Sequence, residues 1–262
     1  MTVSDPASHP ASDPPRDILR VEQMYRVRFD EATPDSLAKT SALLGYVGDV
    51  AWRHSEILGF PREWYRDRGL AWVVRAIDVS LAAPIRDGDE LRVSTRLAGF
   101  RRVMVRRRSE LRAADGASVG DVTVDWAMTD GRAPTRIPAD FTRVPGIDVA
   151  SFTPTRVHLP PSPHGAVEQR LMPRLRELDP VGHANNGVYP DWLDEAVAAA
   201  GGADDVRAAA RRYRIEYLRP AGPGVALRSV AWRDGGGWDW RLADDAGDLA
   251  RGRLDPGLSA QP

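Results

Sequence analysis

The stretch from Leu178 to Tyr189 reads LDPVGHANNGVY and decides how the whole chain is interpreted. Asp179 and His183 lie four positions apart in a segment rich in turn-forming residues. Asn185 and Asn186 stand directly before an apolar-periodic segment, where asparagine side chains cap helices. The stretch therefore predicts a loop that carries an acid and a histidine to the N-terminus of a helix, where free backbone N–H groups favour negative charge.

The elements around this loop alternate between sheet and helix patterns. A strand is predicted over about 167–178, and a helix over about 188–200 that ends at Gly201-Gly202. Period-two patterns near 212–218, 226–232, 238–242 and 249–254 predict four further strands. The second half of the chain thus reads as one helix combined with an antiparallel sheet.

The first half shows the same order of elements. Residues 24–30 predict a short strand and 36–58 a helix, followed by strands near 77–81, 91–97, 103–111 and 122–128. Asp30 and Asp179 each precede a helix and lie about 150 residues apart, which we interpret as an internal duplication. Residues 137–163 are rich in proline and favour a linker between the two copies.

Composition narrows the functional classes. Hydrophobic residues make up 42% and charged residues 28% of the 262 residues, as in globular proteins, and no apolar run is long enough to span a membrane. The formal net charge of −1 gives no electrostatic reason to expect nucleic acid as a partner. Without cysteine there is no disulfide or thiolate site, and we expect no metal and no other cofactor. The first fifteen residues do not have the pattern of a signal peptide, so a cytoplasmic protein is predicted.

The loop resembles the Asp-x-Asn-x-His-Val-Asn-Asn loop of the acyl-acyl-carrier-protein (acyl-ACP) thioesterases of plants and bacteria. Three further segments resemble the same family in the same order: Gly69–Val73, the group Trp126, Asp130, Arg136 and Pro138, and Tyr213–Tyr217. The resemblance runs from about residue 24 to residue 254. It implies an α+β double hotdog, with two antiparallel sheets each wrapped around a long central helix.

The resemblance also implies a division of the chain and a reaction. Residues 1–20 and 257–262 would be tails, 21–140 a non-catalytic first hotdog domain with the acyl-chain pocket, 141–164 a linker, and 165–256 the catalytic second domain. The implied reaction is hydrolysis of the thioester of a fatty or polyketide acyl chain on acyl carrier protein. The chain would act as a monomer that is itself a fused pseudo-dimer, or as a homodimer.

The resemblance assigns three catalytic residues. Asp179 matches the loop aspartate that orients or activates water, His183 the histidine that contacts the thioester, and Glu216 the acidic residue of a later strand. Alternation places Glu216 on the strand face opposite Tyr213, Ile215 and Tyr217, so an ion-paired surface glutamate is an equal alternative. Asp179 and the asparagines likewise have a purely structural alternative as turn and capping residues.

Substrate contacts are expected at Asn185, Asn186, Val181 and Trp72. Val181 departs from the family asparagine and removes a side-chain donor and acceptor from the loop. Trp52, Trp64 and Trp72 are candidates to line an acyl tunnel, although large aromatic residues more often form plain core. His54 is expected to be a packed or surface histidine.

Several alternatives remain open. Arginine clusters at 101–102, 106–108 and 211–214 could dock an acidic carrier protein or the phosphates of coenzyme A, or could be solvated strand faces. Besides a carrier-protein thioesterase, the chain could be an acyl-CoA thioesterase or a hotdog dehydratase. It could also be an acyl-binding protein without hydrolytic activity, which Val181 favours.

Overall fold

The computed structural model describes residues 19–144 and 151–257. Most of the predicted tails and part of the predicted linker therefore lie outside the described residues. The described strands form one ten-stranded antiparallel sheet in the order β1-β3-β4-β5-β2-β7-β10-β9-β8-β6. Read from its two edges inward, the sheet has the same order of elements in both halves, because β1-β3-β4-β5-β2 is answered by β6-β8-β9-β10-β7.

The first half contains five strands and the longest helix. The strands are β1 (Arg20–Arg26), β2 (Ala71–Leu81), β3 (Glu90–Arg101), β4 (Met104–Ala113) and β5 (Ser118–Thr129). The helices are η2 (Phe29–Glu31), α1 (Thr40–Ile57), α2 (Arg62–Arg66) and α3 (Ala139–Thr142). Helix α1 packs on β1 and β3 with its apolar side, so the first half is a sheet curved over one long helix.

The second half repeats this plan with shorter elements. Its strands are β6 (Val167–Leu171), β7 (Arg211–Tyr217), β8 (Leu227–Asp234), β9 (Gly237–Asp244) and β10 (Gly247–Pro256). Its helices are η3 (Leu175–Glu177), η4 (Asn186–Val188), α4 (Tyr189–Val197), η5 (Ala198–Gly202) and α5 (Ala203–Val206). Gly201 adopts φ +93°, a left-handed conformation that ends the regular helix near the predicted Gly201-Gly202 stop.

The prediction of two separate sheets is wrong. Strands β2 and β7 pair antiparallel, with Ile77 opposite Ile215 and Asp78 opposite Arg214, and join the halves into one sheet. Each strand would otherwise be an edge with unpaired backbone groups, and the pairing satisfies both. The prediction of a long helix in each half holds only for α1, since α4 has nine residues against eighteen.

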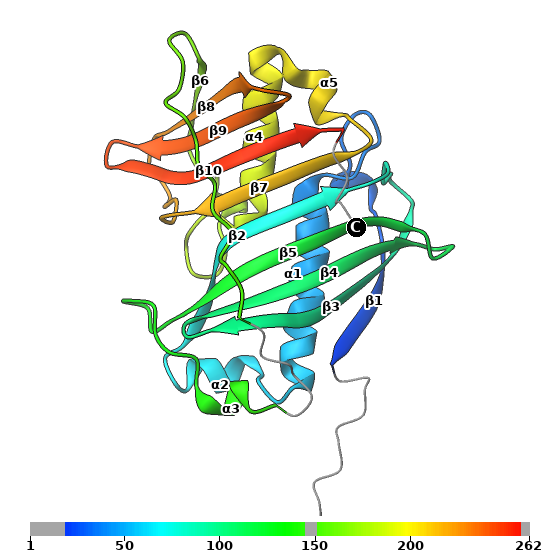
Figure 1. Ribbon diagram of the computed structural model, residues 1–262, viewed down its shortest axis with the longest axis vertical. Helices are drawn as coiled ribbons and strands as arrows, with labels where there is room; N and C mark the ends of the chain where they lie inside the picture. The colour runs from blue at the N-terminus through cyan, green and yellow to red at the C-terminus, as the bar shows by residue number, and fades with distance from the viewer. Residues whose placement is uncertain (1–18, 145–150, 258–262) are drawn as a thin grey trace, which may run out of the picture.

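Helices α1 and α4 lie behind the sheet in the view of Figure 1, and the segment that connects the halves crosses in front of the sheet. The helix side holds a continuous apolar core shared by both halves. On the open side, Thr155 and Arg106 both bind the carboxylate of Asp125 on β5, at 2.8 Å from the Thr155 amide and 2.6 Å from the Arg106 Nε. The connecting segment is thus fastened to the sheet, as expected for a linker crossing the surface.

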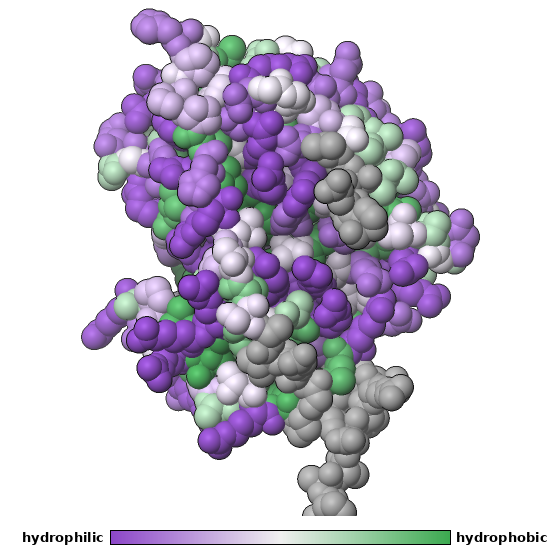
Figure 2. All heavy atoms as spheres, viewed as in Figure 1, coloured by the Kyte–Doolittle hydropathy of each residue, from purple (hydrophilic) through white to green (hydrophobic). Residues whose placement is uncertain are grey.

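The outer surface is predominantly hydrophilic on the open side of the sheet (Figure 2). Within the described ranges, no helix combines the length and hydrophobicity needed to cross a membrane. Most predicted strands and both main helices are confirmed in position. The predicted strands 24–30 and 167–178 are too long at their C-terminal ends, because β1 ends at Arg26 and β6 at Leu171 and the short helices η2 and η3 follow. Helices α2 and α3 were not predicted.

Candidate active site

The predicted loop exists and folds around its own aspartate. Asp179 donates its backbone N–H to the carbonyl of His183 at 2.8 Å, and its Oδ1 accepts from the backbone N–H groups of Val181 and His183 at 2.9 and 3.3 Å. Gly182 adopts φ +85°, which glycine tolerates and which lets the chain reverse. One carboxylate oxygen therefore holds the loop, and Oδ2 has no hydrogen bond from any described residue.

The loop is fixed to the rest of the second half by backbone hydrogen bonds. The Ala184 N–H donates to the Ala221 carbonyl at 2.9 Å. The side-chain oxygen of Asn185 accepts from the Gly187 N–H at 2.8 Å and caps η4. The side-chain oxygen of Asn185 thus forms the helix cap that the structural alternative predicted, and the expected contact of Asn185 with substrate stays a prediction.

Two tyrosines that the sequence analysis did not single out support the helix end of the loop. The Tyr217 hydroxyl donates to the Asn186 carbonyl at 2.8 Å, and the Tyr189 hydroxyl accepts from the Ala221 N–H at 3.2 Å. Both tyrosines are buried. Burial raises the pKa of Tyr189 to about 12, so its hydroxyl stays protonated near neutral pH.

The first half contains a second copy of this loop. The copies lie 146 residues apart and share three backbone interactions. In the first copy these are the bridge Ala32–Ala38 and the hydrogen bonds from Thr33 to Leu37 and from Lys39 to Glu31. In the second copy they are the bridge Leu178–Ala184 and the hydrogen bonds from Asp179 to His183 and from Asn185 to Glu177. Thr33 and Leu37 of the first copy therefore correspond to Asp179 and His183 of the second. The duplication is borne out by this geometry, but the pairing of Asp30 with Asp179 is corrected, because Asp30 corresponds to Arg176.

Glu216 does not join Asp179 and His183. It is 4% exposed and accepts hydrogen bonds from the Arg156 side chain and, at 3.1 Å, from the Val157 N–H. These partners belong to the connecting segment on the open side of the sheet. Because side chains alternate along a strand, it is the next residue, Tyr217, that faces the loop. Glu216 is ion-paired, as the alternative predicted, but buried rather than at the surface.

The remaining predicted contacts lie in different places. Val181 is 75% exposed at the tip of the loop. Trp72 stands on β2 in an aromatic cluster, with its ring 5.5 Å from that of Phe141 on α3. His54 is fully buried and accepts from the guanidinium of Arg107 at 2.8 Å. Arg107 was grouped with the surface arginines, although alternation with the buried Val105 and Leu111 would have placed it inside.

A groove of about 1100 Å³ runs over the point where the N-terminal ends of α1 and α4 meet. Asp191 and Asp194 of α4 line it, together with Lys39 and Arg211. Burial raises the pKa of Asp191 to about 6 and that of Asp194 to about 8, and Asp194 Oδ1 is buried without a hydrogen-bond partner in the described residues. Tyr213 and Arg211 lower the pKa of Asp194 only in part. A protonated carboxylic acid at neutral pH is the consequence.

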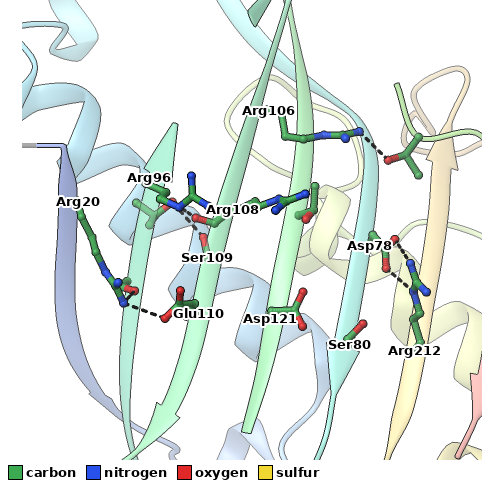
Figure 3. Close-up of a pocket in the computed structure, with 14 residues that line it drawn as sticks. Arg20, Asp78, Ser80, Arg96, Arg106, Arg108, Ser109, Glu110, Asp121 and Arg212 are labelled. Carbon is green, nitrogen blue, oxygen red and sulfur yellow. Dashed lines mark hydrogen bonds and ion pairs between the residues drawn. The ribbon is translucent and has the colours of Figure 1, made fainter. Parts of the chain in front are cut away.

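A second hollow, of about 510 Å³, lies on the open side of the sheet (Figure 3). Arg20, Arg96 and Arg108 stand opposite one another on β1, β3 and β4. Arg20 is bound by Ser94 and Glu110 at 2.8 and 2.9 Å, whereas the guanidinium groups of Arg96 and Arg108 have no hydrogen bond or ion pair to any residue of the described ranges. Adjacent unpaired guanidinium groups make this hollow attractive to an anion.

Comparisons with a family model, with curated sequences and with solved structures relate this chain to known proteins. Residues 19–144 match the family model of the acyl-ACP thioesterase N-terminal domain. A search of curated protein sequences finds no match. Among solved structures, a Lactobacillus plantarum protein assigned as an oleoyl thioesterase superposes with a TM-score of 0.77 at 17% identity, covering 93% of this chain and 96% of that one.

Two further structures have the same fold. The 12:0-ACP thioesterase from Umbellularia californica has a TM-score of 0.76 at 21% identity, covering 90% of this chain and 96% of that one. An acyl-ACP thioesterase from Bacteroides thetaiotaomicron has a TM-score of 0.75 at 14% identity, covering 90% and 97%. The hotdog-like fold of the acyl-ACP thioesterases thus extends over the chain, and residues 19–144 match the N-terminal domain of that family.

Proposed function

We propose that this chain hydrolyses the thioester of an acyl chain carried by acyl carrier protein, and that the loop from Asp179 to Asn186 is its active site. The observation that carries the proposal is the loop itself. It presents a carboxylate with a free oxygen and an imidazole directly before a helix N-terminus. Its copy in the first half keeps the backbone geometry without either group.

The chemistry assigns each group a task. A water oxygen forms a bond to the thioester carbonyl carbon, the C–S bond breaks, and the water proton ends on the departing thiolate. Asp179 Oδ2 orients the water and accepts its proton, since Oδ1 is engaged by the loop. His183 contacts the thioester, takes this proton from Asp179 and gives it to the sulfur as the C–S bond breaks. The backbone N–H of Asn186, the first residue of η4, stabilises the developing oxyanion, since the N–H groups of Gly187 and Val188 are bonded to Asn185.

This site uses fewer side chains than the family pattern. Glu216 binds the connecting segment on the far side of the sheet, and Val181 supplies no amide. If the missing amide contacted the oxyanion, its absence would lower the rate by about 10²–10³-fold. We therefore expect hydrolysis to be slow compared with an enzyme that has the full set.

The two halves take different roles in this proposal. Residues 21–140 hold the acyl chain in the first hotdog unit, and 165–256 supply the reacting groups in the second. The Arg20–Arg96–Arg108 row on the open side of the sheet is a candidate contact for the acidic carrier protein.

The test is a panel of acyl chains presented on carrier protein and on coenzyme A to the purified protein. Release of free acid from carrier thioesters in preference to coenzyme A thioesters is the expected result. Faster hydrolysis of the coenzyme A thioesters would make it an acyl-CoA thioesterase instead. Conversion of a 3-hydroxyacyl thioester into the unsaturated thioester, with loss of water and an intact C–S bond, would point to dehydration.

A non-hydrolytic acyl-binding protein is the second candidate, favoured by Val181 and by the position of Glu216. It predicts saturable binding of acyl-carrier thioesters with no free acid after prolonged incubation. Binding without turnover would therefore replace the hydrolytic proposal with this one.

A further inference from the structure

The core of the first half contains a buried cation that forms no ion pair with a carboxylate of the described residues. Arg107 of β4 is 5% exposed and donates to His54 Nδ1 at 2.8 Å and to Ser55 Oγ at 2.9 Å, both on α1. Neither carries a negative charge, and none of the described carboxylates forms an ion pair with Arg107. Burial lowers the pKa of Arg107 to about 10, which leaves it charged at neutral pH.

Unsatisfied donors gather in the same part of the core. Within the described ranges, Trp52 Nε1, Tyr65 Oη and Trp126 Nε1 are buried without a hydrogen-bond partner. The Trp52 and Tyr65 rings lie 5.8 Å apart. Burial raises the pKa of Tyr65, and the nearby Trp72 and Ser55 side chains offset this only in part, without reaching hydrogen-bond geometry with its hydroxyl. Trp126 stands on β5, opposite Val105 and thus two residues from Arg107 on the neighbouring strand.

A purely structural role explains only part of this cluster. The bonds of Arg107 to His54 and Ser55 fasten α1 to the sheet. They leave three donors unmatched, and each buried polar group without a partner destabilises the fold. A buried cation is also normally paired. The three neutral donors lack an acceptor, and Arg107 lacks a negatively charged partner among the described residues, so the cluster is suited to bind an oxygen atom.

The cluster also lies where an acyl chain from the loop would reach. Tyr217 contacts the loop at Asn186, its strand β7 pairs with β2, and Val74 of β2 lies opposite Trp126 of β5. Strand β4, which carries Arg107, is the third strand from β7, so the two strands are separated by about 14 Å at 4.8 Å per strand.

We propose that the acyl chains accepted by this protein carry an oxygen acceptor, such as a keto, hydroxyl or carboxylate group, at the end remote from the thioester. The acceptor binds the cluster of Arg107, Tyr65 and Trp126. This inference rests on the proposed thioesterase site for the orientation of the chain. It excludes plain methyl-terminated chains as the preferred substrates, because they would leave the donors of the cluster unmatched.

The test compares carrier-bound chains of equal length that end in a methyl, a ketone, a hydroxyl or a carboxylate. We expect kcat/KM for the best oxygenated chain to exceed that for the methyl chain by at least about tenfold. Faster hydrolysis of the carboxylate chain than of the ketone chain would show that the charge of Arg107 dominates the binding of the end group. Faster hydrolysis of the ketone chain would show that the neutral donors dominate it. Equal or faster hydrolysis of the methyl chain overturns the inference.

Two variants separate binding from folding. Tyr65→Phe removes only the oxygen of an orphan donor, so Tm should stay the same or rise while the preference for the oxygenated chain falls about three- to tenfold or more. Trp126→Phe removes its orphan donor together with part of a packed ring, so Tm should fall, and the preference for the oxygenated chain should fall as well. Tyr25→Phe, which removes a hydroxyl bound to Asp49 elsewhere on α1, is the matched control and leaves the preference unchanged. An unchanged preference in both cluster variants contradicts the proposal.

The same chains as non-hydrolysable thioether analogues keep the two proposals distinguishable. If no thioester is hydrolysed, the thioesterase proposal fails, and tighter binding of the oxygenated analogue, weakened by Tyr65→Phe, still supports the cluster. If hydrolysis proceeds but analogues bind regardless of their end group, the cluster proposal fails alone.

Discussion

Replacing Asp194 with asparagine should stabilise the protein, and more so as the pH rises. The carboxyl group of Asp194 has a pKa of about 8 in the folded protein, mainly because of burial, against 3.8 for the unperturbed group. Between these two values the folded state binds a proton that the unfolded state has released. The free energy of unfolding therefore falls as pH rises through this window.

The magnitude follows from the two pKa values. At pH 7, keeping Asp194 protonated costs up to about 4 kcal/mol at 1.36 kcal/mol per pH unit above the unfolded pKa. The side chain keeps some solvent contact, so we expect about 2–4 kcal/mol. Asparagine has nearly the same shape and no charge, and so removes this cost. The advantage of Asp194→Asn should be near zero at pH 4 and level off above about pH 8.

Urea denaturation followed by tryptophan fluorescence at pH 5, 6, 7 and 8 measures this difference. The exposed Asp245→Asn is the matched control and should change the unfolding free energy by less than about 0.5 kcal/mol at every pH. A destabilised Asp194→Asn protein, or a stabilisation independent of pH, would refute the claim that the buried carboxyl is held protonated.

Three further substitutions test the account of the fold and the site. Glu216→Gln should destabilise the protein by about 1–3 kcal/mol in urea denaturation, because Arg156 loses its anion, and should leave kcat within about threefold of wild type. Loss of hydrolysis at unchanged stability would show that Glu216 is catalytic. Gly252→Ala should cost more than about 2 kcal/mol in the same assay, since the added Cβ would lie 2.8 Å from Trp240, and a neutral result would contradict that packing. Tyr217→Phe removes the hydrogen bond to the loop carbonyl and should lower kcat while shifting unfolding by only about 1 kcal/mol; equal kcat would show that the loop does not depend on it.

Local patterns predicted the elements well because each strand and helix has its own period. Residues 90–101 and 118–129 alternate as strands must, and 40–57 follow a helical period. The pairing of β2 with β7 had no such signal, because the choice of partner for an edge strand depends on how the halves meet. One sheet in place of two was therefore beyond local reasoning.

The candidate site was predicted in the part that is continuous in sequence. Asp179 and His183 share a loop whose turn and cap residues fix their neighbourhood. Glu216 is remote in sequence, and alternation gave its strand face correctly but not which face meets the loop. Tyr217, one residue later, faces it instead. Arg107 was obscured by its charged neighbours, since a run of arginines hides the alternation that buries one of them.

The rate of a single turnover of carrier-bound acyl thioester by Asp179→Asn tests the central claim most directly. Asparagine keeps the oxygen that accepts from the loop backbone and removes the carboxylate, so the fold should persist while free-acid release falls at least about 10²-fold. Thr33→Val, in the copy of the loop, should leave the rate unchanged. An Asp179→Asn protein that releases acid as fast as wild type would contradict the account.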